Sequence, residues 1–370
     1  MATEDAVLDA LREVEDPELG RSIVELGMIA AVRAKRRHVT VEVALTSDSH
    51  PWRDVLLAAI ESTAVGAAGG SRVDLDVRTM DDAEIARLMD VLGVAPESQP
   101  GETRENDFQT GRSRARVVAV SSGKGGVGKS SIATNLAVAL AQRGSRVGLV
   151  DADVWGFSIP RMLGVDRPPN LVGRVIVPPE VHGVRCVSIG YFVDEDQAVV
   201  WRGPMLHKAM EQFLVDVYWG ELDYLLVDMP PGTGDIAISL SQFLPTVEVV
   251  VVTTPQLAAQ RVAVRAGAMA QNANQRVLGV IENMSWLPEA DGSRRAIFGE
   301  GGGAALAEQL EVPLLGQVPV DEDLRVGSDE GHPVVIARPE SPAAAEIVRI
   351  ADKIAATHRT RIRRPELKIT

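Results

Sequence analysis

A glycine-rich stretch, Ser122–Ser130, carries the clearest chemistry in this sequence. It reads Ser-Gly-Lys-Gly-Gly-Val-Gly-Lys-Ser and fits the phosphate-binding pattern of glycine, four residues, then glycine-lysine-serine. Inward-facing backbone N–H groups would cradle a polyphosphate, Lys129 would neutralise it, and Ser130 would ligate Mg²⁺. The stretch therefore predicts a nucleoside triphosphate site whose contacts are Gly123, Gly125, Gly126, Val127, Gly128, Lys129, Ser130 and Ser131.

Three aspartates stand where apolar, strand-like runs end. Asp151 and Asp153 follow one such run with a single residue between them, and Asp228 ends another. We expect Asp151 and Asp228 to support Mg²⁺, partly through water, and Asp153 to orient the attacking water. The proline- and glycine-containing loop Met229–Asp235 then suits a switch that reports the γ-phosphate. These residues predict hydrolysis of a nucleoside triphosphate rather than binding alone, with Lys129 and Asp153 as catalytic residues.

The elements that must position these residues alternate between apolar runs and helical patterns. The runs are residues 117–120, 147–150, 225–227, 247–252, 277–281 and 314–318, and a helical pattern covers Ser130–Arg143. Continuous apolar strands separated by helices predict an α/β domain, here residues 114–357, with a parallel sheet covered by helices on both faces. Ligand groups gather at the carboxyl ends of such strands, which is where the motifs fall.

A smaller α+β domain is expected before this one, over residues 1–94. Its pattern is a helix from Ala6 to Val14, a strand at 39–45, a helix after Pro51, a strand at 73–77 and a helix at 81–92. The polar residues 95–113 predict a flexible linker, and residues 358–370 predict a basic, solvated tail.

Composition excludes several classes of protein. The formal net charge of -13 disfavours a nucleic-acid partner, and no apolar run is long enough to span a membrane. The acidic N-terminus does not resemble a signal peptide. The single cysteine, Cys186, fits a reducing compartment, so we expect a cytoplasmic protein with no membrane partner.

Lys124 is not needed for ordinary phosphate binding. It resembles the signature lysine of the deviant-Walker-A ATPases, which include MinD, ParA, the nitrogenase iron protein and the Mrp/ApbC carriers. In that group this lysine reaches the nucleotide of the partner subunit. The resemblance implies a homodimer whose nucleotide sites are completed in trans and an ATPase in which Lys124 is catalytic together with Lys129 and Asp153.

The sequence most resembles the Mrp/ApbC family of iron–sulfur cluster carrier ATPases. The matching stretches include Ser121–Ser131, Val150–Gly156, Asp228–Asp235 and Ile281–Ser285, together with 201–205, 219–224, 253–256 and 298–302. Residues 14–20, 23–29 and 45–46 resemble an iron–sulfur-assembly accessory domain. The resemblance implies ATP with Mg²⁺, Asn283 reading the adenine edge, and transfer of clusters to apoprotein clients or exchange with assembly factors.

The sequence departs from the family where the cluster would be held. Members usually carry a CxxC pair, shared across the dimer, a few residues after Asn-Met-Ser. Glu289 and Gly292 occupy these positions here. Clusters are held chiefly by thiolates, and Cys186 lies in a strand-like run where a buried, packing role is favoured. His50 stands where the accessory family has a cysteine, and a polar residue at the start of a helix is favoured over a metal ligand.

Two functions therefore stay open. The first is a cluster carrier whose binding is weak, uses atypical ligands or is supplied by a partner, so that the cluster ligands are unknown. The second is a nucleotide-switched scaffold like MinD or ParA, without a cluster. The proline in Thr360–Pro365 counts against the membrane-binding tail that MinD-like action needs.

Overall fold

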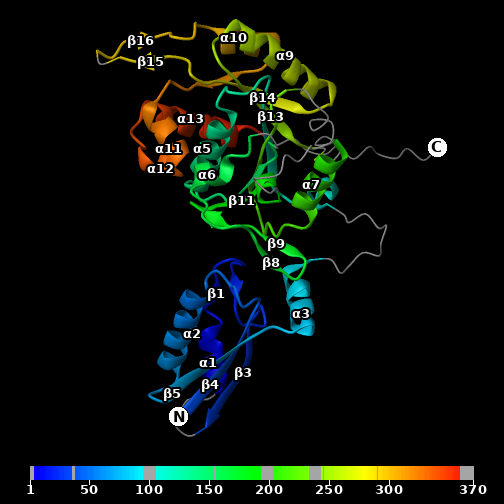
Figure 1. Cartoon of the computed structure of the whole chain (residues 1–370), viewed down its shortest axis with the longest axis vertical. Helices are drawn as coiled ribbons and strands as arrows, with labels where there is room; N and C mark the ends of the chain where they lie inside the picture. Colours follow the sequence, from blue (N-terminus) through cyan, green and yellow to red (C-terminus); the bar gives the residue numbers. More distant parts are fainter. Residues whose placement is uncertain are drawn as a thin grey trace, which may run out of the picture. The chain divides into compact units, whose positions relative to one another are not determined.

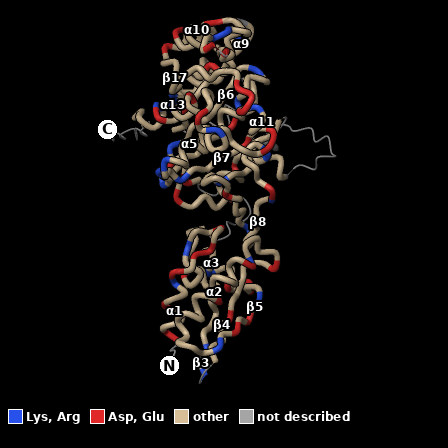
Figure 2. The backbone as a smooth tube through the Cα atoms, turned by 90° about the vertical axis from the view of Figure 1, so that its left-hand side faces the viewer, with Lys and Arg blue, Asp and Glu red and all other residues tan. Residues whose placement is uncertain are grey.

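The computed structural model describes residues 4–35, 38–94, 106–153, 156–192, 203–232, 243–244, 246–289 and 291–358. The chain divides into two compact units (Figure 1). The N-terminal chain forms the small unit together with residues 169–178 and 216–220, and the rest forms the large unit. In each unit, acidic positions are interspersed with basic ones among the described residues (Figure 2).

The small unit is built on a three-stranded sheet in the order β3-β4-β5. Its elements are α1 (Glu4–Leu11), β1 (Glu15–Asp16), β2 (Arg21–Ser22), β3 (Ile29–Lys35), β4 (His38–Leu45), α2 (Arg53–Ala67), β5 (Arg72–Thr79) and α3 (Asp82–Leu92). The alternating valines of β4 are buried, and they pack with Leu56 and Ile60 of α2. β4 and β5 run parallel because α2 crosses over between them. The predicted α+β character is confirmed.

Two stretches expected in the ATPase domain belong to the small unit instead. The stretches are residues 169–178 and 216–220. The first contains the hairpin of β8 (Asn170–Val172) and β9 (Val175–Val177), whose valines join the core of the small unit. The Asn170 amide donates to the Glu18 carboxylate at 3.0 Å. Local patterns do not reveal this exchange, because the hairpin's apolar residues resemble those of any other short strand.

His50 lies immediately before the segment that leads into α2, as expected for a residue at the start of a helix. Its Nδ1 accepts from the Trp52 N–H at 3.3 Å. Its side chain is buried beside Asp16, with Nε2 at 3.0 Å from Asp16 Oδ2. Within the described ranges, no group of three or more histidine, cysteine, aspartate or glutamate residues is placed to hold a metal.

The end of the predicted linker is folded rather than extended. Helix α4 (Asp107–Thr110) buries Phe108, and the Asn106 side chain accepts from the Phe108 N–H. The Asn106 amide also donates to the Phe243 carbonyl at 3.2 Å. A polar composition hid this short helix, because a single capping residue and one aromatic side chain hold it. Residues 95–105 and the predicted tail 359–370 lie outside the described residues.

The large unit confirms the predicted parallel sheet. The order is β10-β11-β7-β12-β6-β13-β14-β17, and only the edge strand β10 runs antiparallel to its neighbour. The strands are β6 (Arg116–Ser122), β7 (Val147–Asp151), β10 (Glu180–Val181), β11 (Val184–Ser188), β12 (Tyr224–Asp228), β13 (Glu248–Thr253), β14 (Arg276–Glu282) and β17 (Leu314–Gln317). Every residue of β7, β12 and β13 is buried, because helices cover both faces.

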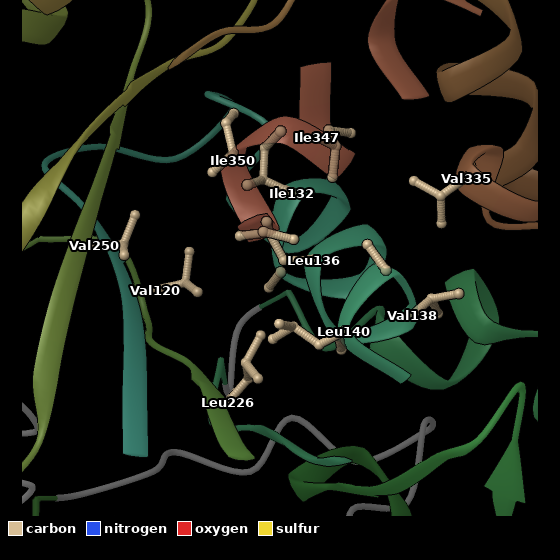
Figure 3. Packing of buried hydrophobic residues seen from close by; sticks show 14 of the residues in the cluster. Val120, Ile132, Leu136, Val138, Leu140, Leu226, Val250, Val335, Ile347 and Ile350 are labelled. Atoms are coloured by element: carbon tan, nitrogen blue, oxygen red, sulfur yellow. The ribbon is translucent and has the colours of Figure 1, made fainter. Parts of the chain in front are cut away.

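Helix α5 (Lys129–Ala141) is the core helix of the large unit. Ile132, Leu136 and Leu140 point toward strand residues such as Leu226 on one side and toward α13 (Pro342–Ala356) on the other (Figure 3). Figure 1 shows α5 and α6 on one side of the strands and α7 on the other. The remaining elements are α6 (Ile159–Leu163), η1 (Ile189–Phe192), α7 (Gly203–Val215), α9 (Leu257–Asn272), β15 (Leu287–Pro288), β16 (Arg294–Arg295), α10 (Gly302–Gln309), α11 (Glu322–Glu330) and α12 (Val334–Ala337).

We expect Arg116→Met to destabilise the large unit by about 3 kcal/mol, because breaking a buried ion pair leaves a poorly compensated charge. Arg116 Nε lies 2.5 Å from Glu248 Oε2, with both side chains buried. Arg143→Met removes an ion pair with Asp352, whose side chain is 56% exposed, and should cost less than about 1 kcal/mol. Urea unfolding of both variants measures the difference, and equal losses would contradict it.

Candidate nucleotide-binding site

The phosphate-binding loop joins β6 to α5, as its pattern requires. Gly126 and Gly128 have φ values of +77° and +80°, a conformation that side-chain-bearing residues rarely adopt. Gly128 is also the residue before the first turn of α5. The loop therefore ends at a helix N-terminus, whose unpaired N–H groups and dipole favour an anion.

Two loop glycines are needed for space as well. A Cβ at Gly123 would lie 2.3 Å from the Ala263 backbone nitrogen in α9. A Cβ at Gly128 would lie 2.2 Å from Asn283 Nδ2. At Gly126, by contrast, an added Cβ meets no atom within 4 Å. The loop thus backs closely onto α9 and Asn283 while the backbone near Gly126 is open.

The predicted catalytic and metal residues converge beside this loop. Lys129 Nζ lies 2.6 Å from Asp228 Oδ1 and 3.5 Å from Asp153 Oδ2. The Ser130 hydroxyl donates to Asp228 Oδ2 at 2.5 Å. All of these groups come from the ends of two neighbouring strands and from the first turn of α5. The parallel topology explains why residues nearly 100 positions apart meet.

Asp151 lies next to Asp228 in the paired register of β7 and β12. It is buried, and its carboxylate accepts from the N–H groups of Asp153, Ser158 and Ile159 and from the Ser188 hydroxyl. Burial, and secondly the Asp228 charge, raise the pKa of Asp151 to about 7. Burial also raises the pKa of Asp228, against the stabilising charge of Lys129. Paired buried acids of this kind favour a cation between or beside them.

Asn283 contacts the loop from the end of β14. Its Nδ2 donates to the Val127 carbonyl at 2.9 Å, and its backbone N–H donates to the Thr253 carbonyl. Its Oδ1 is buried without a hydrogen-bond partner. That oxygen can accept from an exocyclic amino group, as adenine offers, whereas the oxygen that guanine has in its place cannot donate.

Two predicted site residues point elsewhere. The Ser131 hydroxyl lies 3.3 Å from Ser328 Oγ and contacts Met162, so only its backbone remains available to phosphate. The Lys124 ammonium does not join Lys129 but donates to Gln256 Oε1 at 3.2 Å. Of the loop Met229–Asp235, residues 233–235 lie outside the described residues. Gly232 anchors its start through an N–H donated to the Ser122 carbonyl.

The constellation fits a Mg²⁺–polyphosphate. Asp153 Oδ1 is buried and unpartnered, Asp228 and Ser130 offer the oxygen donors that Mg²⁺ prefers, and the open loop backbone suits an anion. When bound, Mg²⁺ neutralises charge on the phosphate oxygens. Ser130 and Asp228 would hold the cation, with Asp151 beside them, Lys129 would neutralise phosphate charge, and Asp153 would be available to orient a water.

The positions expected to hold a cluster form the turn of a short hairpin. β15 and β16 pair, and Glu289 closes the turn by donating its N–H to the Ser293 carbonyl. The Glu289 carboxylate pairs with Arg295 at 2.7 Å, and Gly292 has φ +82°. Gly292 offers no ligand, so these positions do not fit an iron–sulfur cluster. Cys186 is wholly buried in β11, and burial raises the pKa of its thiol.

Comparison with known proteins identifies both units. The family described as NUBPL iron-transfer P-loop NTPase matches residues 113–355, and the iron-sulfur cluster assembly protein family matches residues 4–75. The chain belongs to the iron-transfer P-loop NTPase family. As a member with an intact phosphate-binding loop, it is an ATPase. The predicted deviant-Walker-A resemblance is confirmed at the level of the family.

Two relatives of this iron-transfer NTPase match nearly its whole length, and a third matches about two thirds of it. The iron-sulfur cluster carrier protein of Mycobacterium leprae is 46% identical over 96% of this chain and 93% of its own. That of Bacillus subtilis is 40% identical over 90% of this chain and 95% of its own. That of Escherichia coli is 49% identical over 65% of this chain and 66% of its own.

Solved structures show the same fold for the ATPase part of this iron-transfer NTPase. The nucleotide-binding protein of Archaeoglobus fulgidus in complex with ADP is 34% identical, with a TM-score of 0.55, over 63% of this chain and 93% of its own. The Pyrococcus furiosus cell division ATPase MinD is 27% identical, with a TM-score of 0.51, over 65% of this chain and 98% of its own.

Sequence reasoning missed the residues that support the site from a distance. Ser188 ends β11 and holds Asp151 through a 3.0 Å hydrogen bond. Gln256 receives Lys124 from the start of α9. The signal for Ser188 was its place at a strand end next to β7, but strand order is not visible in the sequence.

Proposed function

We propose that this ATPase is a homodimeric iron–sulfur cluster carrier that uses ATP to switch between states that hold and release its cargo. The observation that carries the proposal is the convergence of Lys129, Ser130, Asp153 and Asp228 on one loop. The family to which the chain belongs supports iron transfer as the purpose of that machinery. The described residues contain no helix long and apolar enough to cross a membrane. The single cysteine supports a reducing compartment, and we propose the cytoplasm.

Each residue has a defined part in the proposed reaction. Lys129 and the loop amides stabilise charge on the transferring phosphoryl group. Ser130, Asp228 and Asp151 hold Mg²⁺, Asp151 partly through water. Asp153 orients the attacking water, and Asn283 Oδ1 accepts from the adenine amino group. Gly123–Ser131 supply the cradle.

Lys124 completes the site of the partner subunit in this proposal. Lys124→Ala should leave ATP affinity of the monomer within about twofold but lower turnover by about a hundredfold, because the positive charge acts in trans on the transition state. Equilibrium binding of a fluorescent ATP analogue and a phosphate-release assay measure the two quantities. Lys208→Ala, an exposed lysine of α7, is the matched control. Unchanged turnover in Lys124→Ala would contradict a composite site.

The cargo requires ligands from outside the hairpin turn. Glu289 is paired and Gly292 has no side chain, so we propose that the cluster is held weakly, by atypical ligands, or together with a thiolate-bearing partner. Apoprotein clients or assembly factors would then supply part of the coordination. Coordination by a partner would let the chain act as an ATP-dependent carrier although its own thiol, Cys186, is buried.

Anaerobic reconstitution tests the cargo proposal. The protein is incubated with ferrous iron, sulfide and reductant, alone and with an apoprotein client, and iron is counted after desalting. We expect little iron on the protein alone and ATP-dependent cluster appearance in the client. A stable four-iron cluster on the isolated protein would contradict shared coordination.

A scaffold like MinD is the second candidate, favoured by the fold shared with that ATPase and by the lost cysteines. It predicts ATP-dependent association with a vesicle and no effect on client clusters. Co-sedimentation with anionic vesicles, with and without ATP, separates the two functions.

A further inference from the structure

The Lys124 side chain is directed by one acceptor in its own subunit. Its Nζ donates to Gln256 Oε1 at 3.2 Å, and the Thr254 hydroxyl donates to the same oxygen at 3.4 Å. Gln256 precedes α9, yet its side chain makes no capping hydrogen bond to that helix. Its amide oxygen is therefore used for the lysine and the threonine, not for starting the helix.

The backbone beneath Lys124 has little freedom to move. The Ser122 hydroxyl donates to the Lys124 carbonyl at 3.1 Å. Gly123 is so close to α9 that a Cβ would lie 2.4 Å from the Val262 carbonyl carbon. Lys124 itself is partly buried. A change of partner must then come from rotation of its flexible side chain rather than from movement of the loop.

We infer that Gln256 is a positioning residue that holds Lys124 within its own subunit until an ATP-bound second copy of this chain offers phosphate charge. The inference rests on the proposed action of Lys124 in trans. A neutral amide is a suitable acceptor for this purpose, because its oxygen lacks the full negative charge by which a phosphate or carboxylate oxygen attracts an ammonium group. Polyphosphate therefore displaces the glutamine, whereas a carboxylate at this position would keep the lysine.

The charge of residue 256 then determines the protein concentration at which the ATP-bound dimer forms. Gln256→Ala removes the competing acceptor, so half-maximal ATP turnover should need about fivefold less protein. Gln256→Glu replaces it with an ion-pair partner, so about tenfold more protein should be needed. Turnover at saturating protein should stay within about twofold in Gln256→Ala, because the group that reaches the phosphate is unchanged.

The experiment titrates full-length protein at saturating Mg²⁺ and ATP and follows phosphate release per subunit. Sedimentation velocity with ATP gives the dimer fraction at each concentration. Gln260→Ala, one turn along α9, is the matched control and should behave as the wild type. The double variant Lys124→Ala/Gln256→Ala should dimerise like Lys124→Ala alone, since the glutamine acts through the lysine.

Opposite shifts for Gln256→Ala and Gln256→Glu that vanish without Lys124 would support the inference. Shifts in the same direction, or shifts that persist in the Lys124→Ala background, would show a merely structural role and overturn it. If the wild type dimerises with ATP but the Gln256 variants match it, the inference alone fails. If wild-type turnover per subunit does not depend on concentration and no dimer forms, the dimeric function fails, and the inference with it.

Discussion

Lys129→Ala is expected to lower ATP turnover by about a thousandfold or more. Removing a preorganised charge or donor at the reacting phosphate costs roughly 10² to 10³ in kcat, and phosphate loops depend on positioned charge for nearly all of their catalysis. Lys129 Nζ lies within 3.5 Å of both Asp228 and Asp153, so the same ammonium also organises the carboxylates. No other described cation takes a comparable place between these acids.

Lys129→Ala needs a control for folding, because it removes the positive partner of buried Asp228. Circular dichroism and the sedimentation coefficient of the variant should match those of the wild type, and Lys129→Arg should retain charge but misplace it. Phosphate release is measured at saturating Mg²⁺ and ATP. A Lys129→Ala protein that is folded and turns over ATP within tenfold of the wild type would remove this lysine from the mechanism.

The sequence predicted the part of the fold that repeats one pattern. Strands β6, β7, β12 and β13 are continuous apolar runs, buried on both faces, and each was expected within a residue or two of its observed bounds. Strand β3 escaped notice because Ile29–Lys35 lacks strong β-branched alternation and pairs with β4 along one side. The hairpin at 170–177 was assigned to the wrong unit, because contacts such as Asn170 to Glu18 join distant parts of the chain.

The candidate site divides in the same way. The residues of the phosphate-binding loop and the aspartates at strand ends were predicted, since their chemistry is written in local spacing. The direction of Lys124, the support of Asp151 by Ser188 and the contact of Asn283 with Val127 were not. Each of these contacts depends on which strands or helices lie side by side. Local sequence patterns do not show that arrangement, because the residues in contact are far apart in the chain.

The phosphate-binding loop and the β15–β16 hairpin of the large unit differ in how many of the groups needed for their expected tasks are present. At the phosphate-binding loop, one subunit supplies a lysine charge, oxygen donors and a buried carboxylate, and in our proposal only Lys124 comes from the second copy. At the hairpin, Glu289 and Arg295 satisfy each other and nothing soft remains to bind iron. If the proposed carrier function holds with coordination shared by clients, the ATP-bound complex with a client is the state of most interest.

Asp153→Ala should capture that state. Asp153 Oδ1 is buried and unpartnered, while Oδ2 lies 3.5 Å from Lys129 Nζ, so the carboxylate can orient a water without being the main partner of the lysine. Losing a group that positions or activates the nucleophile costs roughly 10² to 10⁴ in rate. We therefore expect ATP hydrolysis to fall by about a hundredfold or more while Lys129, Ser130 and Asp228 continue to bind nucleotide.

The measurement for Asp153→Ala pairs phosphate release with sedimentation velocity in ATP, with exposed Asp166→Ala as the control. Slow hydrolysis together with a persistent ATP-bound dimer separates loss of water activation from loss of binding, because Lys129→Ala should lose turnover without accumulating that dimer. Enrichment of iron–sulfur apoproteins on the immobilised Asp153→Ala dimer, but not on Lys129→Ala, would tie the nucleotide state to the cargo. Undiminished hydrolysis in Asp153→Ala would contradict this role and show that another group orients the attacking water. Asp151, which accepts from four donors and lies beside Asp228, would be the next carboxylate to test.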